Sequence, residues 1–488
     1  MKSARVIRIN AIALLIALSI PISLAAQEPP TKQQKYSLVD IGTFGGPSSG
    51  FVGVGAHSVN NRGTATGGAE TPTPDPYAPN CFTSDCFVAH TFLSQDGGLP
   101  TDMGALPGVN NSGPNDINAN GMVTGISENG SIDPTTGLPE YDAVVWKNGQ
   151  IINLGTFGGN WSYANALNNE GQVAGFALNT TPDSFNLGDF CMNGPFPTQM
   201  QAFIWQNGVM QNLGTLGGPD SCALWLNQSG QAAGHSFTNS TPNSTTGIPT
   251  LDPFLWDRRR MIDLGTLGGT LGVANWLNNR GQVVGQSNLA GDLTAHPFLW
   301  DRGSLKDLGT LGGTFGVATS VSDAGVIVGG ATNQNDQAFL AFVWKNGVMT
   351  DLGTLPGDDC SLATNINSGG QIVGFSFPCA GGPSHAFLWD KGSLVDLNTF
   401  VPSGSELQLT EATYINDRRE ISVQGVLPNG DTRAVLLVPG GQGETLVSAT
   451  HARTVTQHSL TPSEIMAAVR ARLGKRYHIP SLEASPRD

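Results

Sequence analysis

A short glycine-rich segment returns eight times along the 488-residue chain, and this repetition limits the fold more than any other feature. The copies begin at Asp40 (DIGTFGG), Asp102 (DMGALPG), Asn153 (NLGTFGG), Asn212 (NLGTLGG), Asp263 (DLGTLGG), Asp307 (DLGTLGG), Asp351 (DLGTLPG) and Asp396 (DLNTF). The last four starts lie 44, 44 and 45 residues apart, whereas the earlier ones lie 62, 51, 59 and 51 apart. A unit of about 44 residues, lengthened by insertions in the first half of the chain, has the length of one β-propeller blade.

Each unit has the pattern of four short strands. An apolar run ending in Trp, such as AFLW up to Trp389, precedes a tight turn such as Asn148-Gly149 and a strand that ends in the DLG segment. Asn-Gly between apolar runs predicts a type I′ hairpin turn. A glycine-rich bend and a second strand pair, joined by a turn such as Asn278 to Gly281, complete the unit. Two hairpins per unit predict four antiparallel strands.

The two ends of the repeat region complement each other. The first unit, from Tyr36, lacks the Trp-type strand, whereas the chain after the eighth unit supplies one more such strand at residues 433–437. We therefore predict that the C-terminal strand fills the first blade and closes the ring, which removes exposed sheet edges. The predicted fold is an all-β, eight-bladed propeller. An open β-repeat solenoid is the alternative, although it does not explain why one end lacks what the other supplies.

The first 26 residues predict a secretory signal peptide. Lys2, Arg5 and Arg8 precede an uncharged stretch, and small residues follow it up to Ala26. The stretch is too short for a membrane anchor. We therefore expect the mature protein to be secreted, either extracellular or periplasmic, without insertion into a membrane.

A change of composition after the repeats predicts a short helix. Thr461 as cap, Pro462 in the first helical position and Glu464 closing a capping box start this helix. The predicted organisation is a signal peptide at 1–26, a linker at 27–35, the repeat domain at 36–440, a linker at 441–460, the helix at 461–476 and a tail at 477–488.

Charge limits the partners of the mature chain. Without the three basic residues of the signal peptide, 21 basic and 38 acidic residues remain, which gives a net charge of −17. Such a chain repels phosphate backbones, so we expect no nucleic-acid partner. We expect a monomer.

Six cysteines in an exported chain predict disulfides. Proximity along the sequence favours three pairs, Cys81 with Cys86, Cys191 with Cys222 and Cys360 with Cys379, although fifteen connectivities are possible. A zinc site is the alternative for Cys81 and Cys86, but no second ligand pair follows at zinc spacing. We predict no metal and no cofactor.

The repeats resemble the HAF family of extracellular repeats. The resemblance rests on the GTLGG-type segments with AFLW before them and IN..GQVVG after them, and HPFLWDRGSLKDLGTLGG, from His296 to Gly313, is a close match. It covers roughly residues 36–440 and implies an exported bacterial repeat protein. It implies no reaction, no ligand and no catalytic residues.

Two polar positions recur in the units. One precedes the Trp-type strand, at His90, Asp142, Gln201, Asp252, His296, His385 and Arg433, with Leu340 as the exception. We interpret these as strand-entry residues rather than a metal ring, because equivalent positions on neighbouring blades diverge. The other is the DLG carboxylate. Because Asn153 and Asn212 replace it in two units, we interpret it as an acceptor for backbone N–H groups at the bend.

The insertions are the best functional lead in the sequence. They occupy one place in the unit, between the GQVVG strand and the Trp-type strand, at Thr71–Phe87, Glu128–Glu140, Leu178–Met200 and Phe237–Leu251. Loops at one topological position emerge on one face, which is often the binding face. The candidate ligand-binding residues are Tyr77, Phe82, Phe87, Phe185, Phe190 and Phe196. Tolerated surface insertions are the alternative.

The motifs of common active sites are absent from the sequence, including G-x-S-x-G, H-E-x-x-H and the P-loop. We therefore expect a non-catalytic binding module that recognises a glycan or an extracellular protein, and no catalytic residues. One alternative is a propeller glycosidase or lyase, with carboxylates such as Asp142 and Asp252 converging within about 5–9.5 Å. Another is a purely structural envelope protein.

Overall fold

The computed structural model describes residues 35–440, except for 54–55, 135–136, 186–190 and 192–195. Within these residues, no helix is long and apolar enough to cross a bilayer. The predicted signal peptide and the predicted helix at 461–476 lie outside the described residues.

The described chain forms 32 strands that pair antiparallel in groups of four, called blades here and numbered in chain order. Blade 1 joins β1 (Tyr36–Asp40) to β30 (Gln408–Ile415), β31 (Ile421–Val426) and β32 (Thr432–Pro439). Blade 2 contains β2 (Ser49–Phe51), β3 (Thr64–Pro74), β4 (Phe87–Gln95) and β5 (Thr101–Asp102). Blade 3 contains β6 (Ser112–Ile117), β7 (Val123–Ile132), β8 (Pro139–Lys147) and β9 (Gln150–Asn153). Blade 4 contains β10 (Ser162–Leu167), β11 (Val173–Pro182), β12 (Thr198–Gln206) and β13 (Val209–Gly214).

The remaining blades repeat this arrangement. Blade 5 contains β14 (Ser221–Leu226), β15 (Ala232–Phe237), β16 (Leu251–Asp257) and β17 (Arg260–Asp263). Blade 6 contains β18 (Gly268–Leu277), β19 (Val283–Leu289), β20 (Ala295–Asp301) and β21 (Ser304–Asp307). Blade 7 contains β22 (Gly312–Val321), β23 (Ile327–Asn333), β24 (Phe339–Lys345) and β25 (Val348–Asp351), with the 3-10 turn η1 (Gln334–Asp336) after β23. Blade 8 contains β26 (Cys360–Ile366), β27 (Ile372–Phe377), β28 (His385–Asp390) and β29 (Ser393–Asp396), and η2 (Leu397–Phe400) follows it.

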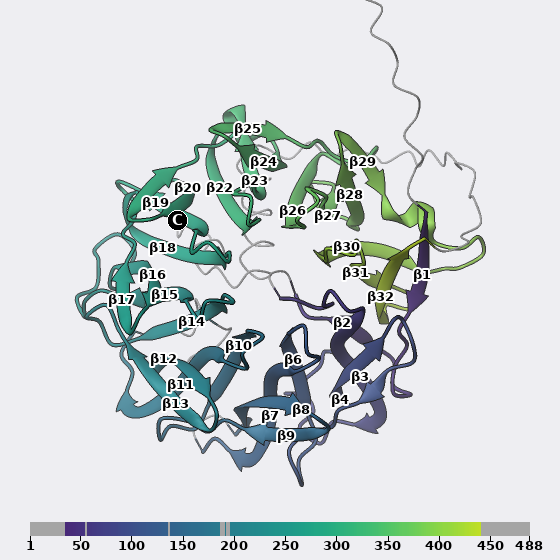
Figure 1. Ribbon diagram of the computed structural model, residues 1–488, viewed down its shortest axis with the longest axis horizontal. Coiled ribbons are helices and arrows are strands. Elements are labelled where there is room, and N and C mark those ends of the chain that lie inside the picture. The colour runs from purple at the N-terminus through teal and green to yellow at the C-terminus, as the bar shows by residue number, and fades with distance from the viewer. Residues whose placement is uncertain (1–34, 54–55, 135–136, 186–190, 192–195, 441–488) are drawn as a thin grey trace, which may run out of the picture. The chain divides into compact units, whose positions relative to one another are not determined.

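The blades are arranged in a ring, with one strand of each blade nearest the centre (Figure 1). In each blade the strand that follows the glycine-rich bend is innermost, and the strand that ends in the DLG segment is outermost. The DLG bends and the insertions therefore share one face of the ring, and the Asn-x-x-Gly turns lie on the other.

Pairing of the two chain ends closes the ring. Strand β1 lies antiparallel to β32, with Tyr36 opposite Pro439 and Asp40 opposite Val435. This confirms the predicted closure by the C-terminal strand and makes the open solenoid wrong. The fold is a β-propeller in which one blade contains strands from both ends of the repeat region.

A ring of asparagine side chains connects the blades at the turn opposite the DLG bend. The side chain of Asn278 donates from Nδ2 to the carbonyl oxygen of Ser322 in the next blade, at 2.9 Å. Equivalent bonds run from Asn60 to Asn118, Asn118 to Asn168, Asn168 to Asn227, Asn227 to Asn278, Asn367 to Asn416 and Asn416 to Asn60. The bond from Asn416 to Asn60 connects the last repeat to the first, and Ser322 replaces asparagine at the one remaining position.

The hydrophobic core lies between successive blades. In one cluster, Ala233 and Leu255 of blade 5 pack against Phe298 and Trp300 of blade 6. Phe298 is completely buried, and burying such a ring contributes roughly 2–3 kcal/mol. Each blade is covered by apolar side chains on both faces, which is why its inner strands read as apolar runs.

Three disulfides are present, and they join the pairs that were predicted from proximity along the sequence: Cys81 with Cys86, Cys191 with Cys222, and Cys360 with Cys379. The first closes a loop within an insertion. The second attaches an insertion of blade 4 to β14 of blade 5, and the third connects β26 to the segment after β27.

Candidate functional site

The innermost strand of blade 2 differs in length from its counterparts. Eleven residues separate Ser49 from Asn60, whereas six separate Ser112 from Asn118 in blade 3. The serines are equivalent, because the hydroxyl of each accepts an N–H from the third strand of the preceding blade. His57 belongs to this longer segment, and sequence analysis missed it because the turn motif at Asn60 is itself regular.

One position of the repeat unit has a different type of side chain in almost every blade. It lies two residues before the turn and is occupied by Ser58, Asp116, Ala166, Trp225, Trp276, Ser320, Asn365 and Tyr414. In a repeat protein, a residue with a structural role recurs in each copy. The one carboxylate and three large aromatic residues at this position therefore stand out as functional candidates.

His57 and Asp116 form a close pair across the contact between blades 2 and 3. The Nδ1 atom of His57 lies 2.8 Å from Oδ1 of Asp116. The same carboxylate accepts the backbone N–H groups of His57, Ile117 and Leu167, the last at 3.0 Å. Asp116 is thereby held in one orientation, and it fixes the imidazole ring with Nδ1 toward the carboxylate.

The opposite ring nitrogen of His57 faces a different environment. Among the described residues no group hydrogen-bonds to its Nε2. The side chain of His57 is 37% exposed, whereas that of Asp116 is 3% exposed. The imidazole is therefore anchored on one side and open on the other.

Aromatic rings surround His57. Its ring centroid lies 5.2 Å from that of Tyr414 in blade 1 and 5.7 Å from that of Trp276 in blade 6, and Trp276 lies 4.7 Å from Trp225. Blades 2 and 6 are on opposite sides of the ring (Figure 1), so these side chains meet near its centre. They give the histidine apolar walls.

The surroundings shift the pKa of both polar rings. Burial by itself lowers the pKa of His57, but the charge of Asp116 and its hydrogen bond more than offset this effect, and the pKa lies above the usual 6.5. Burial raises the pKa of Tyr414, and the charge of Asp116 adds to the shift. Tyr414 therefore keeps its proton at all physiological pH values.

The DLG carboxylates have the structural role that the sequence predicts. Oδ1 of Asp307 accepts the N–H of Gly309 at 2.7 Å, and Asn153 accepts that of Gly155 in the same way. The same bond forms at Asp40, Asp102, Asn212, Asp263, Asp351 and Asp396.

In several blades the strand-entry residue pairs with the DLG residue of the same blade. His296 lies 2.9 Å from Asp307, and Asn153 donates to Asp142 at 2.6 Å. The glycosidase alternative needs Asp142 and Asp252 to converge, but each belongs to its own blade's pair.

The described members of the predicted aromatic set come from two insertions, and Tyr141 and Trp161, with ring centroids 4.9 Å apart, connect the two groups. Phe82 stacks on Tyr141 with ring centroids 5.5 Å apart. Tyr77 and Phe87 are half-buried in the same insertion, which Asp75 organises by accepting the N–H groups of Tyr77 and Phe82.

The other aromatic residues of the set belong to the third insertion. Phe185 packs against Phe237 with centroids 6.5 Å apart, and Phe196 packs against Trp161 at 5.4 Å. Both contact a buried apolar cluster. Phe190 lies outside the described residues.

A cavity of about 280 Å³ lies between blades 1, 2 and 3 on the insertion face, and Phe82 forms part of its wall. Glu70, which is 3% exposed, also lines it and accepts the N–H of Ser48 at 3.0 Å. Burial raises the pKa of Glu70. Its bond to Ser48 holds the bend before β2, so the carboxylate has a structural partner.

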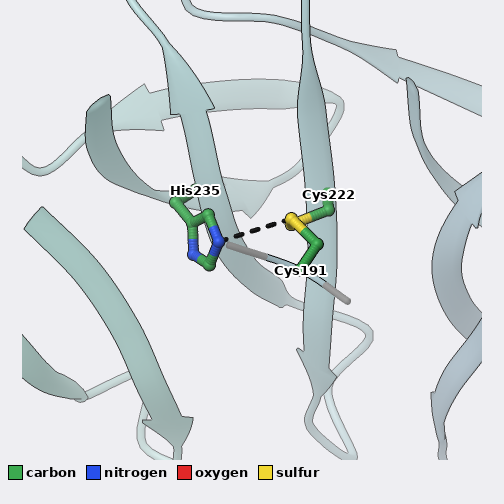
Figure 2. A group of neighbouring side chains, drawn as sticks. All are labelled: Cys191, Cys222 and His235. Carbon is green, nitrogen blue, oxygen red and sulfur yellow. Dashed lines mark hydrogen bonds between the residues drawn. A yellow bond between two sulfur atoms is a disulfide. The ribbon is translucent and has the colours of Figure 1, made fainter. Parts of the chain in front are cut away.

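A buried imidazole lies beside one disulfide. Figure 2 shows His235 of β15 next to Cys191 and Cys222, and its Nε2 is 3.4 Å from Sγ of Cys191. The three ligand-type atoms lie within 4.8 Å of one another. Because the two sulfur atoms are bonded to each other, the group is a packed disulfide rather than a set of metal ligands.

No protein-family model matches the chain, and no curated protein matches it. The resemblance to HAF repeats thus rests on the motifs alone. Among solved structures, the propeller domain of the Trilobed protease from Pyrococcus furiosus is 10% identical, with 69% of this chain and 96% of that chain covered and a TM-score of 0.40. Porphyromonas gingivalis dipeptidyl peptidase 4 is 11% identical (79% and 60% covered, TM-score 0.44), and Trypanosoma rangeli sialidase is 10% identical (66% and 54%, TM-score 0.29).

These structures do not support the expectation of a non-catalytic binding module and of a protein that is not an enzyme. They are a domain of a protease, a peptidase and a sialidase. Identities near 10% show the propeller fold alone and carry over no catalytic residue.

Proposed function

We propose that this protein is a β-propeller hydrolase that cleaves a carboxylic ester or lactone, with His57 as the general base. The observation that carries the proposal is the His57–Asp116 pair, 2.8 Å apart, with Nε2 of the histidine open. A carboxylate that orients an imidazole through Nδ1 and leaves Nε2 to take a proton is the arrangement of a general base.

A water molecule is the proposed nucleophile. The hydroxyl group adjacent to His57 in sequence, that of Ser58, bonds instead to Ser422 at 2.6 Å. Nε2 removes a proton from water, the water oxygen attacks the carbonyl carbon, and the carbon–oxygen bond of the leaving group breaks. The proton then passes to the departing alkoxide. Trp276 and Tyr414 provide apolar walls for the acyl group.

The carboxylate chemistry favours an ester over a glycoside or a phosphate ester. Glycoside hydrolysis needs two free carboxyl groups, whereas Asp116 already accepts hydrogen bonds from four N–H groups. A phosphate ester is repelled by Asp116 and by the net charge of −14.

The proposal predicts a pH profile that rises with pH. Only neutral imidazole can accept a proton, and Asp116 holds the pKa of His57 above 6.5. The rate should therefore increase as pH rises through that pKa and reach a plateau on the alkaline side. Asp116→Asn should move the inflection to lower pH, because the charge that raises the pKa is lost.

The decisive experiment compares two His–Asp pairs of equal geometry. Hydrolysis of p-nitrophenyl acetate and of δ-gluconolactone is measured for the wild type, His57→Ala and His296→Ala. The His296–Asp307 pair is 2.9 Å apart, close to the 2.8 Å of His57 and Asp116, but lies on the outer strands. Loss of a general base lowers kcat by about 100-fold or more. We expect this loss for His57→Ala and near-wild-type rates for His296→Ala.

Equal activity of wild type and His57→Ala would overturn the proposal, as would a failure of the folded wild type to hydrolyse any ester or lactone of the panel. Circular dichroism of each variant separates a loss of chemistry from a loss of fold.

We also propose that the protein acts outside the cytoplasm, as the HAF resemblance implies. Three disulfides support this, because such bonds persist in oxidising compartments.

A further inference from the structure

The polar residue of the third strand and the DLG residue of the fourth have one fixed register in all eight blades. In blade 6, Asp307 lies opposite Phe298, and the polar residue His296 is two positions before that phenylalanine. The same offset holds in the other seven blades. Each blade thus places these two side chains next to each other on the insertion face.

Most of these pairs combine a donor with an acceptor. Where the third strand carries a base, the fourth carries aspartate, as in His90 with Asp102 at 2.9 Å. His296 with Asp307 and Arg433 with Asp40 follow the same pattern. The pairs therefore complement each other in hydrogen bonding as well as in position.

Where the third strand carries an acceptor, the DLG residue changes to asparagine. The amide of Asn153 donates to Asp142 at 2.6 Å, and that of Asn212 donates to Gln201 at 3.4 Å. Two blades lack the pair: Leu340 is apolar, and His385 bonds to Asp358 instead.

Blade 5 breaks the rule. Both members, Asp252 and Asp263, are carboxylic acids, so neither ionised side chain can donate to the other. Asp252 is 8% exposed, and its Oδ1 has no hydrogen-bond partner within the described residues. Oδ1 of Asp263 accepts the N–H of Gly265 at 2.8 Å. The hydrogen atom that lies between the two side chains in the other polar pairs is missing from this pair.

We propose that Asp252 and Asp263 form a proton-binding site, in which one proton shared by the two carboxyl groups at neutral pH supplies the missing donor. Loss of that proton in alkaline solution places two negative charges against each other at the outer edge of blade 5. The site makes the attachment of β17 to β16 sensitive to pH.

The elements packed around the pair provide no positive charge to replace the proton. Strands β13, β14 and β18 contain no ionisable residue. On β15, Ser236 lies opposite Asp252, and His235 lies opposite Pro253 and so faces the other side of the blade. On β17 the only base is Arg260, which lies opposite Asp257 at the far end of the hairpin.

Burial, together with the charge and hydrogen bond of Asp263, raises the pKa of Asp252 to about 7. An unfolded aspartate has a pKa of about 3.9. Between these values the folded protein holds a proton that the unfolded chain has lost. The pair therefore lowers the stability of the folded protein as pH rises from about 4 to about 7, and causes no further change above pH 7. Within this range the unfolding equilibrium constant rises at most tenfold per pH unit.

The test is urea unfolding of the full chain between pH 5 and pH 9, for the wild type and Asp263→Asn. The variant copies the Asp142–Asn153 pair of blade 3, so its amide supplies a permanent donor. From pH 5 to pH 8 we expect the unfolding constant of the wild type to rise about tenfold or more relative to the variant. Asp220, whose pKa burial and Asp183 also raise to about 7, contributes equally to both proteins and cancels in the comparison.

Asp351→Asn is the matched control, because the third-strand partner of Asp351 is the apolar Leu340. It should keep the pH dependence of the wild type. Asp252→Asn, the reciprocal variant, should remove it in the same way as Asp263→Asn. Infrared difference spectra between pH 5 and pH 8 should show a titrating carboxyl group in the wild type in addition to that of Asp220, and this additional signal should be absent from both blade-5 variants.

Parallel pH curves for the wild type and both blade-5 variants, or infrared spectra of the variants identical to that of the wild type, would overturn the proposal.

Discussion

At the scale of the residue, equivalent positions of the eight copies show which side chains maintain the ring. The turn asparagine satisfies three partners: Asn278 donates to Ser322, and its Oδ1 accepts the N–H groups of Arg280 and Gln282. Gly285 is equally constrained, because a Cβ there would collide with the carbonyl oxygen of Val273. Such residues recur because the same backbone contact recurs.

Asn278→Ala should lower the free energy of unfolding by about 2–4 kcal/mol, because it leaves a buried carbonyl and two N–H groups without partners. Asn278→Ser should cost less, since the serine at the equivalent position 322 accepts the N–H of Val326. Urea unfolding of the two variants checks this order. Equal losses for alanine and serine would contradict the role of the side-chain acceptor.

At the scale of the element, the strands are regular and the connections vary. The disulfides stabilise these connections and not the strand ladder: Cys81–Cys86 closes a separation of 5 residues inside one insertion, and Cys360–Cys379 closes one of 19 residues. The extra residues before Asn60 similarly alter one inner strand without changing its blade. Variation is thus concentrated where strands are joined.

Removing the longer loop closure should cost more stability. By chain entropy, Cys360→Ala with Cys379→Ala should lower the free energy of unfolding by about 3 kcal/mol, and Cys81→Ala with Cys86→Ala by about 2 kcal/mol. Calorimetry of the two double variants measures the difference. A greater loss from the shorter loop would show that the disulfide of the first insertion does more than restrict the unfolded chain.

At the scale of the whole molecule, closure depends on five residues of β1. They pair with β32 from opposite ends of the repeat region, which brings together residues about 400 positions apart. This pairing covers the edge that an open array of blades would expose. The ring is therefore expected to unfold from this blade.

A cross-link at the closure should stabilise the whole ring. Ser37 lies opposite Val438, so Ser37→Cys with Val438→Cys places two thiols on paired strands. We expect the disulfide to raise the free energy of unfolding by about 2–4 kcal/mol, because it restricts a very long loop in the unfolded chain. The single variant Ser37→Cys is the control. No gain in the oxidised double variant would mean that unfolding begins elsewhere.

Local patterns predicted much of this fold. The turn glycines and asparagines have the backbone angles that the hairpin signals require, as in Asn148 at φ 51° and Gly149 at φ 73°. The closing strand could be predicted because the repeat region lacks one strand at its first end and has one strand too many at its other end. The pairing partner of a DLG residue was not predictable, because it depends on the register between two strands.

The sequence alone determined the strands, turns and repeat unit of this protein, since these depend on residues within about 44 positions of each other. It also determined the closure, because the strand that is missing at one end of the repeats is present in surplus at the other. Tertiary structure decided the site. His57, Asp116, Tyr414 and Trp276 come from four different blades and meet only because the ring is closed. The spacing of these residues along the chain does not predict that they meet, because the centre of the ring is formed by all the repeats together and not by any one of them.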